Sequence, residues 1–185
     1  DSDDVWSKNK LEFGQWYDLE NYFEEKPINF KDALEELNFL ISDSIRLRLK
    51  SDVPLGINLS GGLDSSMLLH YNTQNEHNFQ NFESFTFYTG NDRYDELPWV
   101  QELIAQYKHN SNFVLLSQNE VLDLCNEVST CQAEPFGGIP TLAYFKVFQS
   151  ASNKNTKVLM DGQGVDEVFL GYDYYASLSD NIIQG

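Results

Sequence analysis

The chain has 185 residues, a length that fits one domain with a sizeable core, and 41% of its residues are hydrophobic and 14% aromatic. Its formal net charge of −17 argues against non-specific binding to nucleic acid or to an anionic membrane, because both carry charge of the same sign. The sequence contains no signal peptide and no apolar run long enough to span a membrane, so we expect a cytoplasmic protein.

The N-terminal segment is acidic and aromatic, and we expect residues 1–28 to form a linker or docking arm. Asn29 is expected to cap a helix from Phe30 to Lys50, in which leucine and isoleucine recur at near-helical spacing. We therefore place the main domain at residues 29–185. The chain begins without Met, and we expect it to be a segment of a longer protein.

The next expected element is an apolar strand at residues 53–59, and it leads into the sequence Ser60-Gly61-Gly62-Leu63-Asp64-Ser65-Ser66. Glycines let a ligand approach the backbone closely, and free N–H groups at a helix start attract anions. Asp64 would repel a bare phosphate, but it suits a Mg²⁺ held between carboxylate and phosphate. A Gly-Gly pair is more often only a turn and Asp-Ser-Ser only a helix cap. The complete string favours a nucleotide site, and it lacks the ending of a Walker P-loop.

The rest of the chain alternates short apolar strands with helices, which predicts an α/β fold with a mainly parallel sheet and helices on both faces. The expected elements are a strand at 85–88, a helix at 97–107, a strand at 113–116, helices at 119–128 and 139–151, and a strand at 157–160. We expect Tyr94-Asp95-Glu96 to cap the helix at 97–107. The loop from Glu134 to Pro140 would either border a substrate pocket or be only a turn.

A second polar loop, Asp161-Gly162-Gln163-Gly164-Val165-Asp166-Glu167, follows the last expected strand. Clustered carboxylates repel one another unless a cation or hydrogen-bond donors stabilise them, so Asp64 and Asp166 are candidate Mg²⁺ ligands. The alternative is a plain helix N-terminus with acids in its first turn. Ligands of parallel sheets bind at the carboxyl ends of strands, and both loops follow strands. We therefore expect the two loops to share one site.

Together these motifs resemble the synthetase domain of asparagine synthetase-type, glutamine-dependent amidotransferases, which have the N-type ATP pyrophosphatase (PP-loop, adenine nucleotide α-hydrolase-like) fold. The resemblance extends from Asn29 to Tyr175. Its residues are Arg46-Leu47, Ser51 to Gly56, Ser60 to Ser66, Tyr94 to Glu96, Glu134 to Phe136, Asp161 to Glu167 and Gly171-Tyr172. Their order favours this branch over GMP synthetase and argininosuccinate synthetase.

The resemblance implies roles for these residues. Ser60 to Ser66 would hold the pyrophosphate part of ATP, and Asp64 and Asp166 would bind Mg²⁺. The adenine would lie against Asn58 and Leu59 with Phe87 opposite, and Asp161 and Gly162 would lie against the nucleotide. Gln163 and Glu167 would face the reaction. The complete set of candidate site residues is Asn58, Leu59, Ser60, Gly61, Gly62, Leu63, Asp64, Ser65, Ser66, Phe87, Asp161, Gly162, Gln163, Asp166 and Glu167.

The resemblance also implies the reaction. A carboxylate, most simply aspartate, would be adenylated with release of pyrophosphate, and ammonia from a glutaminase domain would displace AMP. Three departures accompany it. Gln163 stands where typical relatives carry Glu, and a neutral amide cannot act as a carboxylate base. The glutaminase domain and the helical C-terminal tail are missing, so we expect a domain incomplete at its C-terminus and inactive alone. The alternatives are a non-catalytic nucleotide-binding or interaction module, and a lactam- or peptide-cyclising ligase.

Overall fold

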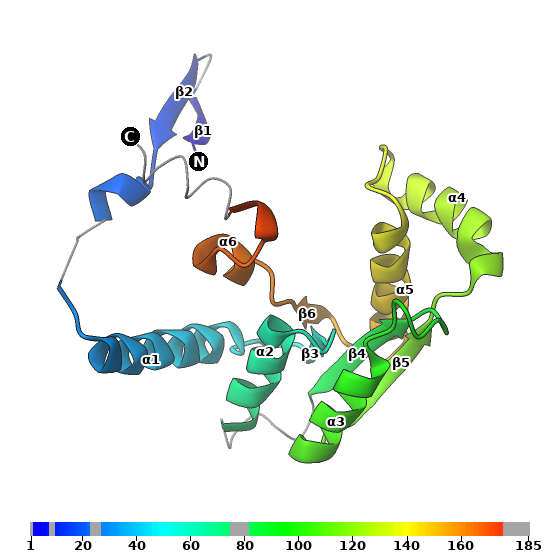
Figure 1. Ribbon diagram of the computed structural model, residues 1–185. Coiled ribbons are helices and arrows are strands. Elements are labelled where there is room, and N and C mark those ends of the chain that lie inside the picture. The colour runs from blue at the N-terminus through cyan, green and yellow to red at the C-terminus, as the bar shows by residue number, and fades with distance from the viewer. Residues whose placement is uncertain (1, 8–9, 23–26, 75–81, 176–185) are drawn as a thin grey trace. The chain divides into compact units, whose positions relative to one another are not determined.

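The computed structural model describes residues 2–7, 10–22, 27–74 and 82–175, to which all structural statements here refer (Figure 1). Two compact units are present, Asp1–Phe39 and Leu40–Gly185, and each is described by itself. Within the described residues, no helix combines the length and apolarity that a membrane crossing requires.

The first unit contains a hairpin that the sequence did not predict. Strands β1 (Ser2–Ser7) and β2 (Lys10–Gln15) pair antiparallel, and a short helix η1 (Leu19–Tyr22) follows. Helix α1 (Phe30–Arg48) starts in this unit and ends in the second. Asn29 accepts a hydrogen bond of 3.0 Å from the backbone N–H of Asp32 through its side-chain oxygen, which confirms the predicted cap.

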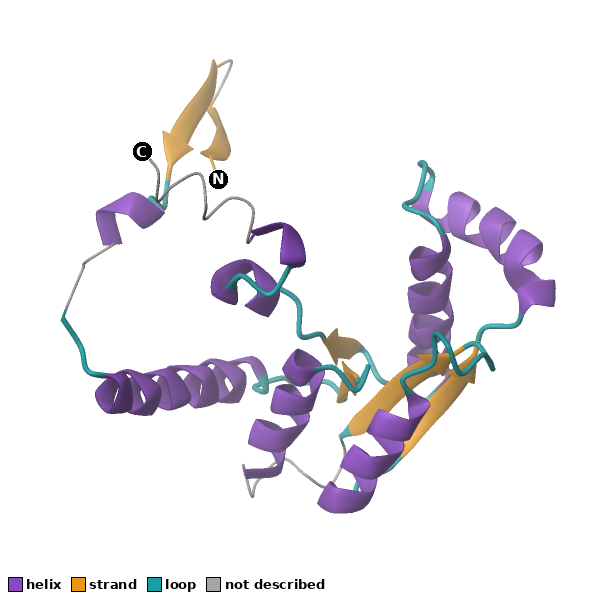
Figure 2. Ribbon diagram, in the orientation of Figure 1, coloured by secondary structure: helices purple, strands orange, loops and turns teal. Residues whose placement is uncertain are grey.

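The second unit is built on a four-stranded parallel sheet in the order β5-β4-β3-β6 (Figure 2). The strands are β3 (Leu55–Asn58), β4 (Glu83–Tyr88), β5 (Ser111–Leu115) and β6 (Val158–Met160). Residue Ile57 of β3 is opposite Ser84 of β4 on one side and Met160 of β6 on the other. The expected parallel α/β sheet is confirmed, with β3 in its interior.

Helices cover both faces of this sheet. Besides the end of α1, they are α2 (Leu63–Gln74), α3 (Leu97–Tyr107), α4 (Val121–Gln132, after the short η3, Gln118–Glu120) and α5 (Ile139–Asn153). The short helix α6 (Val165–Phe169) follows β6 and has no buried residue. On one face Ile57 and Leu59 pack with buried side chains of α1, α2 and α3. On the other face Phe85 packs against Val147 and Ala151 of α5. Because successive strand residues point to opposite faces, this alternation confirms helices on both faces.

Three local details concern the two motifs and the start of α3, and only the last of them differs from the expectation. Helix α2 starts at Leu63, so the second half of the first motif is helical. The second motif likewise ends inside the short helix α6. Asp95 does not cap α3: its carboxylate accepts hydrogen bonds from the backbone N–H (2.6 Å) and hydroxyl (2.7 Å) of Thr89. These two bonds close the loop that leads from β4 to α3.

Candidate functional site

The first polar loop connects the end of β3 to the start of α2, and its hydroxyl groups hold its shape. The Oγ of Ser65 lies 3.1 Å from the Oγ of Ser60 and 3.2 Å from the backbone nitrogen of Ser60. The Oγ of Ser66 donates to the carbonyl oxygen of Gly62 at 2.7 Å. No described residue accepts a hydrogen bond from the backbone N–H of Leu63, Asp64 or Ser65. The first turn of α2 therefore offers N–H groups to an anion.

Gly61 gives the loop its sharp turn and lets it approach α3. Its φ is +83°, in the region that favours glycine. A Cβ built on Gly61 would lie 3.1 Å from the Cβ of Trp99 and 3.2 Å from a methyl carbon of Val100. The start of α3, which follows the loop closed by Asp95, therefore lies directly against the first polar loop and borders the site.

The second polar loop lies directly against the start of α2. A Cβ built on Gly162 would lie 2.7 Å from the Cβ of Asp64 and 3.0 Å from the backbone nitrogen of Ser65. Only glycine fits at this approach. The side-chain nitrogen of Asn58, at the end of β3, also donates to the Oδ2 of Asp161 at 3.2 Å. The two loops therefore meet at the carboxyl ends of β3 and β6, as the sequence led us to expect.

This contact concentrates negative charge. Partial burial raises the pKa of Asp64 above its ordinary value of 3.8, and the negative charges of Asp166 and Glu167 raise that pKa further. None of the ion pairs between described residues involves these three carboxylates. Glu167 accepts a hydrogen bond of 3.0 Å from the hydroxyl of Tyr172. Since no described cationic side chain pairs with these carboxylates, a bound cation would relieve the repulsion.

Asp166 is held by the turn that ends α6. The backbone N–H of Gly171 donates to the carbonyl oxygen of Asp166 at 2.9 Å. A Cβ at position 171 would lie 2.0 Å from Oδ1 of Asp166, so the carboxylate lies directly over this glycine. Among the described residues, no group of three or more His, Cys, Asp or Glu side chains has an arrangement that could hold a metal ion. Asp64 and Asp166 are thus at most a partial ligand set.

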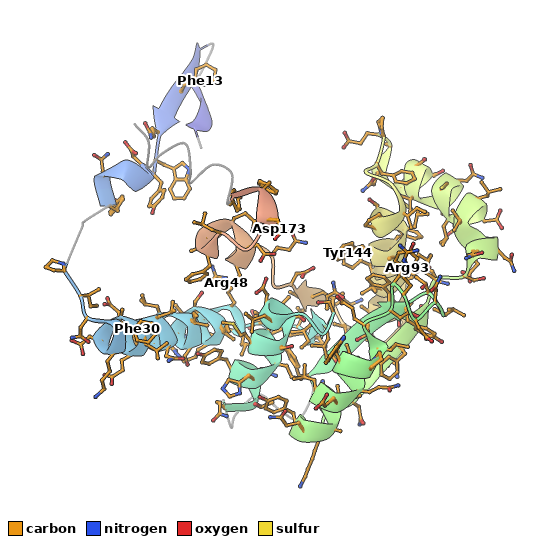
Figure 3. The ribbon with its side chains drawn as sticks, in the orientation of Figure 1. Phe13, Phe30, Arg48, Arg93, Tyr144 and Asp173 are labelled. Carbon is orange, nitrogen blue, oxygen red and sulfur yellow. The ribbon has the colours of Figure 1, made fainter. Side chains whose placement is uncertain are left out.

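Gln163 is linked to α5. Its side-chain Nε2 donates to the hydroxyl of Tyr144 at 3.3 Å. Burial raises the pKa of Tyr144 above its ordinary value of 10.0, and the negative charge of Asp161 raises that pKa further. Figure 3 labels Tyr144, which lies on α5. Tyr144 could not be singled out from the sequence, because it lies 19 residues before Gln163 and belongs to no motif.

The remaining candidate residues are placed as follows. Asn58 is buried at the end of β3, and Leu59 is fully buried with both backbone groups bonded, to Phe85 and to Thr86 of β4. Phe87 of β4 is half-buried and packs toward α4 and α5. The structure therefore brings the two loops together with Asn58, and leaves the adenine roles of Leu59 and Phe87 as predictions.

Three comparisons bear on this arrangement. The family model described as asparagine synthase matches residues 36–182. The chain is 32% identical over 173 residues to "Putative asparagine synthetase [glutamine-hydrolyzing] 2" of Methanocaldococcus jannaschii, covering 91% of this chain and 32% of that protein. It is 25% identical over 187 residues to "Asparagine synthetase [glutamine-hydrolyzing] 3" of Bacillus subtilis, covering 92% of this chain and 29% of that protein. The chain thus spans about a third of the length of these relatives.

Among solved structures, the U34-tRNA thiolase NcsA from Methanococcus maripaludis is similar with a TM-score of 0.51 at 14% identity, over 72% of this chain and 48% of that one. The NH3-dependent NAD synthetase from Campylobacter jejuni gives a TM-score of 0.45 at 16% identity, over 78% and 61% of the two chains. The similarity to the tRNA thiolase supports the parallel α/β fold that the strand order of this chain shows.

Proposed function

The chain belongs to the asparagine synthase family, and from that premise we propose that it forms part of an ATP-dependent amide-forming ligase. The enzyme would adenylate a carboxylate, with aspartate as the first candidate, and would then let an amine displace AMP. The observation that carries this proposal is the contact of Gly162 with Asp64 and Ser65. It joins a loop with anion-binding N–H groups to a loop rich in carboxylates.

In this proposal the start of α2 binds the pyrophosphate part of ATP. The backbone N–H groups of Leu63, Asp64 and Ser65 and the hydroxyl groups of Ser60 to Ser66 would donate to phosphate oxygens. The nucleoside would extend along the ends of β3 and β4, with Asn58, Leu59 and Phe87 near the adenine and Asp161 and Gly162 along the nucleotide. Tight placement of both reactants would supply much of the rate enhancement.

The carboxylates fit a divalent cation. Asp64 and Asp166 would hold Mg²⁺, with phosphate oxygens and water as its further ligands, since Mg²⁺ takes six oxygen ligands. When bound, the cation neutralises charge on the departing pyrophosphate. The pKa of Asp64 is raised first by burial and then by the negative charges of Asp166 and Glu167, and a bound cation would relieve the second of these effects.

The chemistry is two displacements. A carboxylate oxygen attacks the α-phosphorus, and the bond to the β-phosphate breaks with release of pyrophosphate. The amine nitrogen then attacks the acyl carbon, the C–O bond to AMP breaks with its electron pair on oxygen, and the nitrogen loses a proton to water. Gln163 and Glu167 would face the second step, and neither the loops nor α5 need to supply a nucleophile.

Calorimetric titration of the full-length chain with ATP and Mg²⁺ tests the nucleotide site. We expect Asp64→Ala to weaken binding at least about tenfold, which corresponds to about 1.4 kcal/mol. The matched control is Asp123→Ala, an exposed acid in the first turn of α4. Equal binding by wild type and Asp64→Ala would contradict the site, as would no binding by the wild type.

The substrates and partners need the full-length protein. We propose that ammonia comes from a glutaminase domain, in line with the names of the relatives. Pyrophosphate release should depend on one carboxylate when aspartate is compared with other amino acids. Gln163 in place of Glu favours a second candidate, a nucleotide-binding module without catalysis. ATP binding without pyrophosphate release in the presence of any carboxylate would select that second candidate.

A further inference from the structure

The turn that ends α6 bends the chain back onto the two acids of that helix. The backbone N–H of Gly171 donates to the carbonyl oxygen of Asp166 at 2.9 Å, and the hydroxyl of Tyr172 donates to Oε1 of Glu167 at 3.0 Å. The two acids are neighbours in the chain, yet their surroundings differ. Glu167 has a donor in Tyr172, whereas no described group donates a hydrogen bond to the carboxylate of Asp166. The oxygens of Asp166 are therefore available to a bound ligand.

The place of the glycine in this turn is not the usual one. A helix commonly ends with a residue in the left-handed conformation, and that residue is most often glycine because glycine has no Cβ. In α6 the left-handed residue is Leu170, with φ +57°. Gly171 follows it, and the φ of Gly171 lies outside the left-handed region. Backbone freedom therefore does not explain why residue 171 is a glycine.

The space beside its Cα does explain it. A Cβ at position 171 would lie 2.9 Å from Cγ of Asp166 and closer still to Oδ1, both well inside ordinary van der Waals contact. It would lie 3.2 Å from the Cα of Asp166, which needs only a small shift of the backbone. Because the carboxylate is the far end of a side chain that can change rotamer, a larger residue at 171 would turn the carboxylate away and leave the helix folded.

We propose that Gly171 is a positioning residue for the divalent cation, because it leaves the space in which the Asp166 carboxylate keeps the orientation of a cation ligand. The proposal rests on the proposed function and deepens it, since it explains how the second loop offers Asp166 to the cation while Tyr172 engages Glu167. In this orientation the charge of Asp166 acts on Asp64, the other proposed ligand. Gly171 itself does not touch the cation and acts through Asp166 alone.

Binding of Mn²⁺ tests this role without catalysis. The Kd of the full-length protein for Mn²⁺ is measured by electron paramagnetic resonance, with an ATP analogue that has a methylene bridge between its α- and β-phosphates. We expect Gly171→Ala and Asp166→Ala each to raise this Kd about tenfold. The matched control, Gly137→Ala, also adds a methyl group to a glycine, whose nearest neighbour is Oγ1 of Thr141 at 3.9 Å. It should leave the Kd within about twofold.

Two combined variants separate positioning from damage to the fold. In the Asp166→Ala background, Gly171→Ala should not weaken Mn²⁺ binding further, because the carboxylate that the methyl group displaces is absent. The double variant Leu170→Gly/Gly171→Ala moves the glycine to the left-handed position, where it relieves strain at an exposed side chain. We expect this double variant to unfold in urea at no lower concentration than the wild type, and yet to bind Mn²⁺ as weakly as Gly171→Ala does.

The possible failures are distinguishable. Wild-type affinity for Mn²⁺ in Leu170→Gly/Gly171→Ala would overturn the positioning role alone, and so would a further loss of affinity when Gly171→Ala is added to Asp166→Ala. Wild-type affinity in Asp166→Ala would overturn the assignment of Asp166 as a ligand, on which the role of Gly171 depends. Absence of both Mn²⁺ and ATP binding by the wild type would overturn the proposed function, and the positioning role with it.

Discussion

The contact between the two polar loops can be tested by adding one methyl group at Gly162. The φ of Gly162 is not in the left-handed region, so alanine is conformationally allowed there and Gly162→Ala tests the contact alone. The new Cβ would lie 2.7 Å from the Cβ of Asp64 and 3.0 Å from the backbone nitrogen of Ser65, whereas ordinary contacts start at 3.4 Å. Both are parts of a helix start that cannot rotate away, so the loops must separate by several tenths of an ångström.

The magnitude follows from two opposed effects. Overpacking costs about 1–3 kcal/mol. Replacing glycine by alanine stabilises by about 0.4–1 kcal/mol through the unfolded chain. We therefore expect Gly162→Ala to lower the free energy of unfolding by roughly 1–2 kcal/mol. We also expect the Kd for ATP to rise about tenfold, because the helix start and the carboxylates no longer face one ligand.

Urea unfolding and calorimetric titration with ATP and Mg²⁺ measure the two effects. Gly137→Ala is the matched control: its nearest neighbour is the Oγ1 of Thr141 at 3.9 Å, so it should be neutral or stabilising by about 0.4–1 kcal/mol. If Gly162→Ala were as stable as Gly137→Ala and bound ATP as the wild type does, the reasoning about the loop contact would be refuted.

Two further predictions concern the scaffold. A hydrogen bond and ion pair from Lys146 lower the pKa of Glu120 below its ordinary value of 4.5, against the smaller raising effect of burial. This stabilisation is present above the pKa of Glu120 in the unfolded chain and is lost as the pH falls through its pKa in the folded protein. Lys146→Met should therefore lower the free energy of unfolding at pH 7 and leave it unchanged at acidic pH. Equal losses of stability at both pH values would contradict the role of this ion pair. Asp95→Ala should cost about 1–2 kcal/mol in urea unfolding, because the backbone N–H and hydroxyl of Thr89 lose their acceptor, whereas the exposed Asp92→Ala should be near neutral.

Much of the architecture could be predicted because it is encoded locally. Alternating strand and helix patterns predicted the parallel sheet, and the side chain of Asn29 predicted the start of α1. The hairpin of β1 and β2 within residues 1–28 was not predicted, although Leu11 and Phe13 alternate with polar residues along β2. Asp95 was misassigned because an acid before a helix has two possible partners, the helix and its own loop. The structure shows that it takes the loop.

The sequence by itself determined which residues could serve a nucleotide: glycines, hydroxyls and carboxylates clustered directly after two strands. These properties are local, because a loop following a strand carries its chemistry within seven residues of chain. Only the tertiary structure decided which groups meet. Asn58 reaches Asp161 across 103 residues because β3 and β6 are neighbours in the sheet, and Tyr144 reaches Gln163 because α5 packs on the face beside them. Strand order and helix packing depend on burial of the whole core, and no short motif records them.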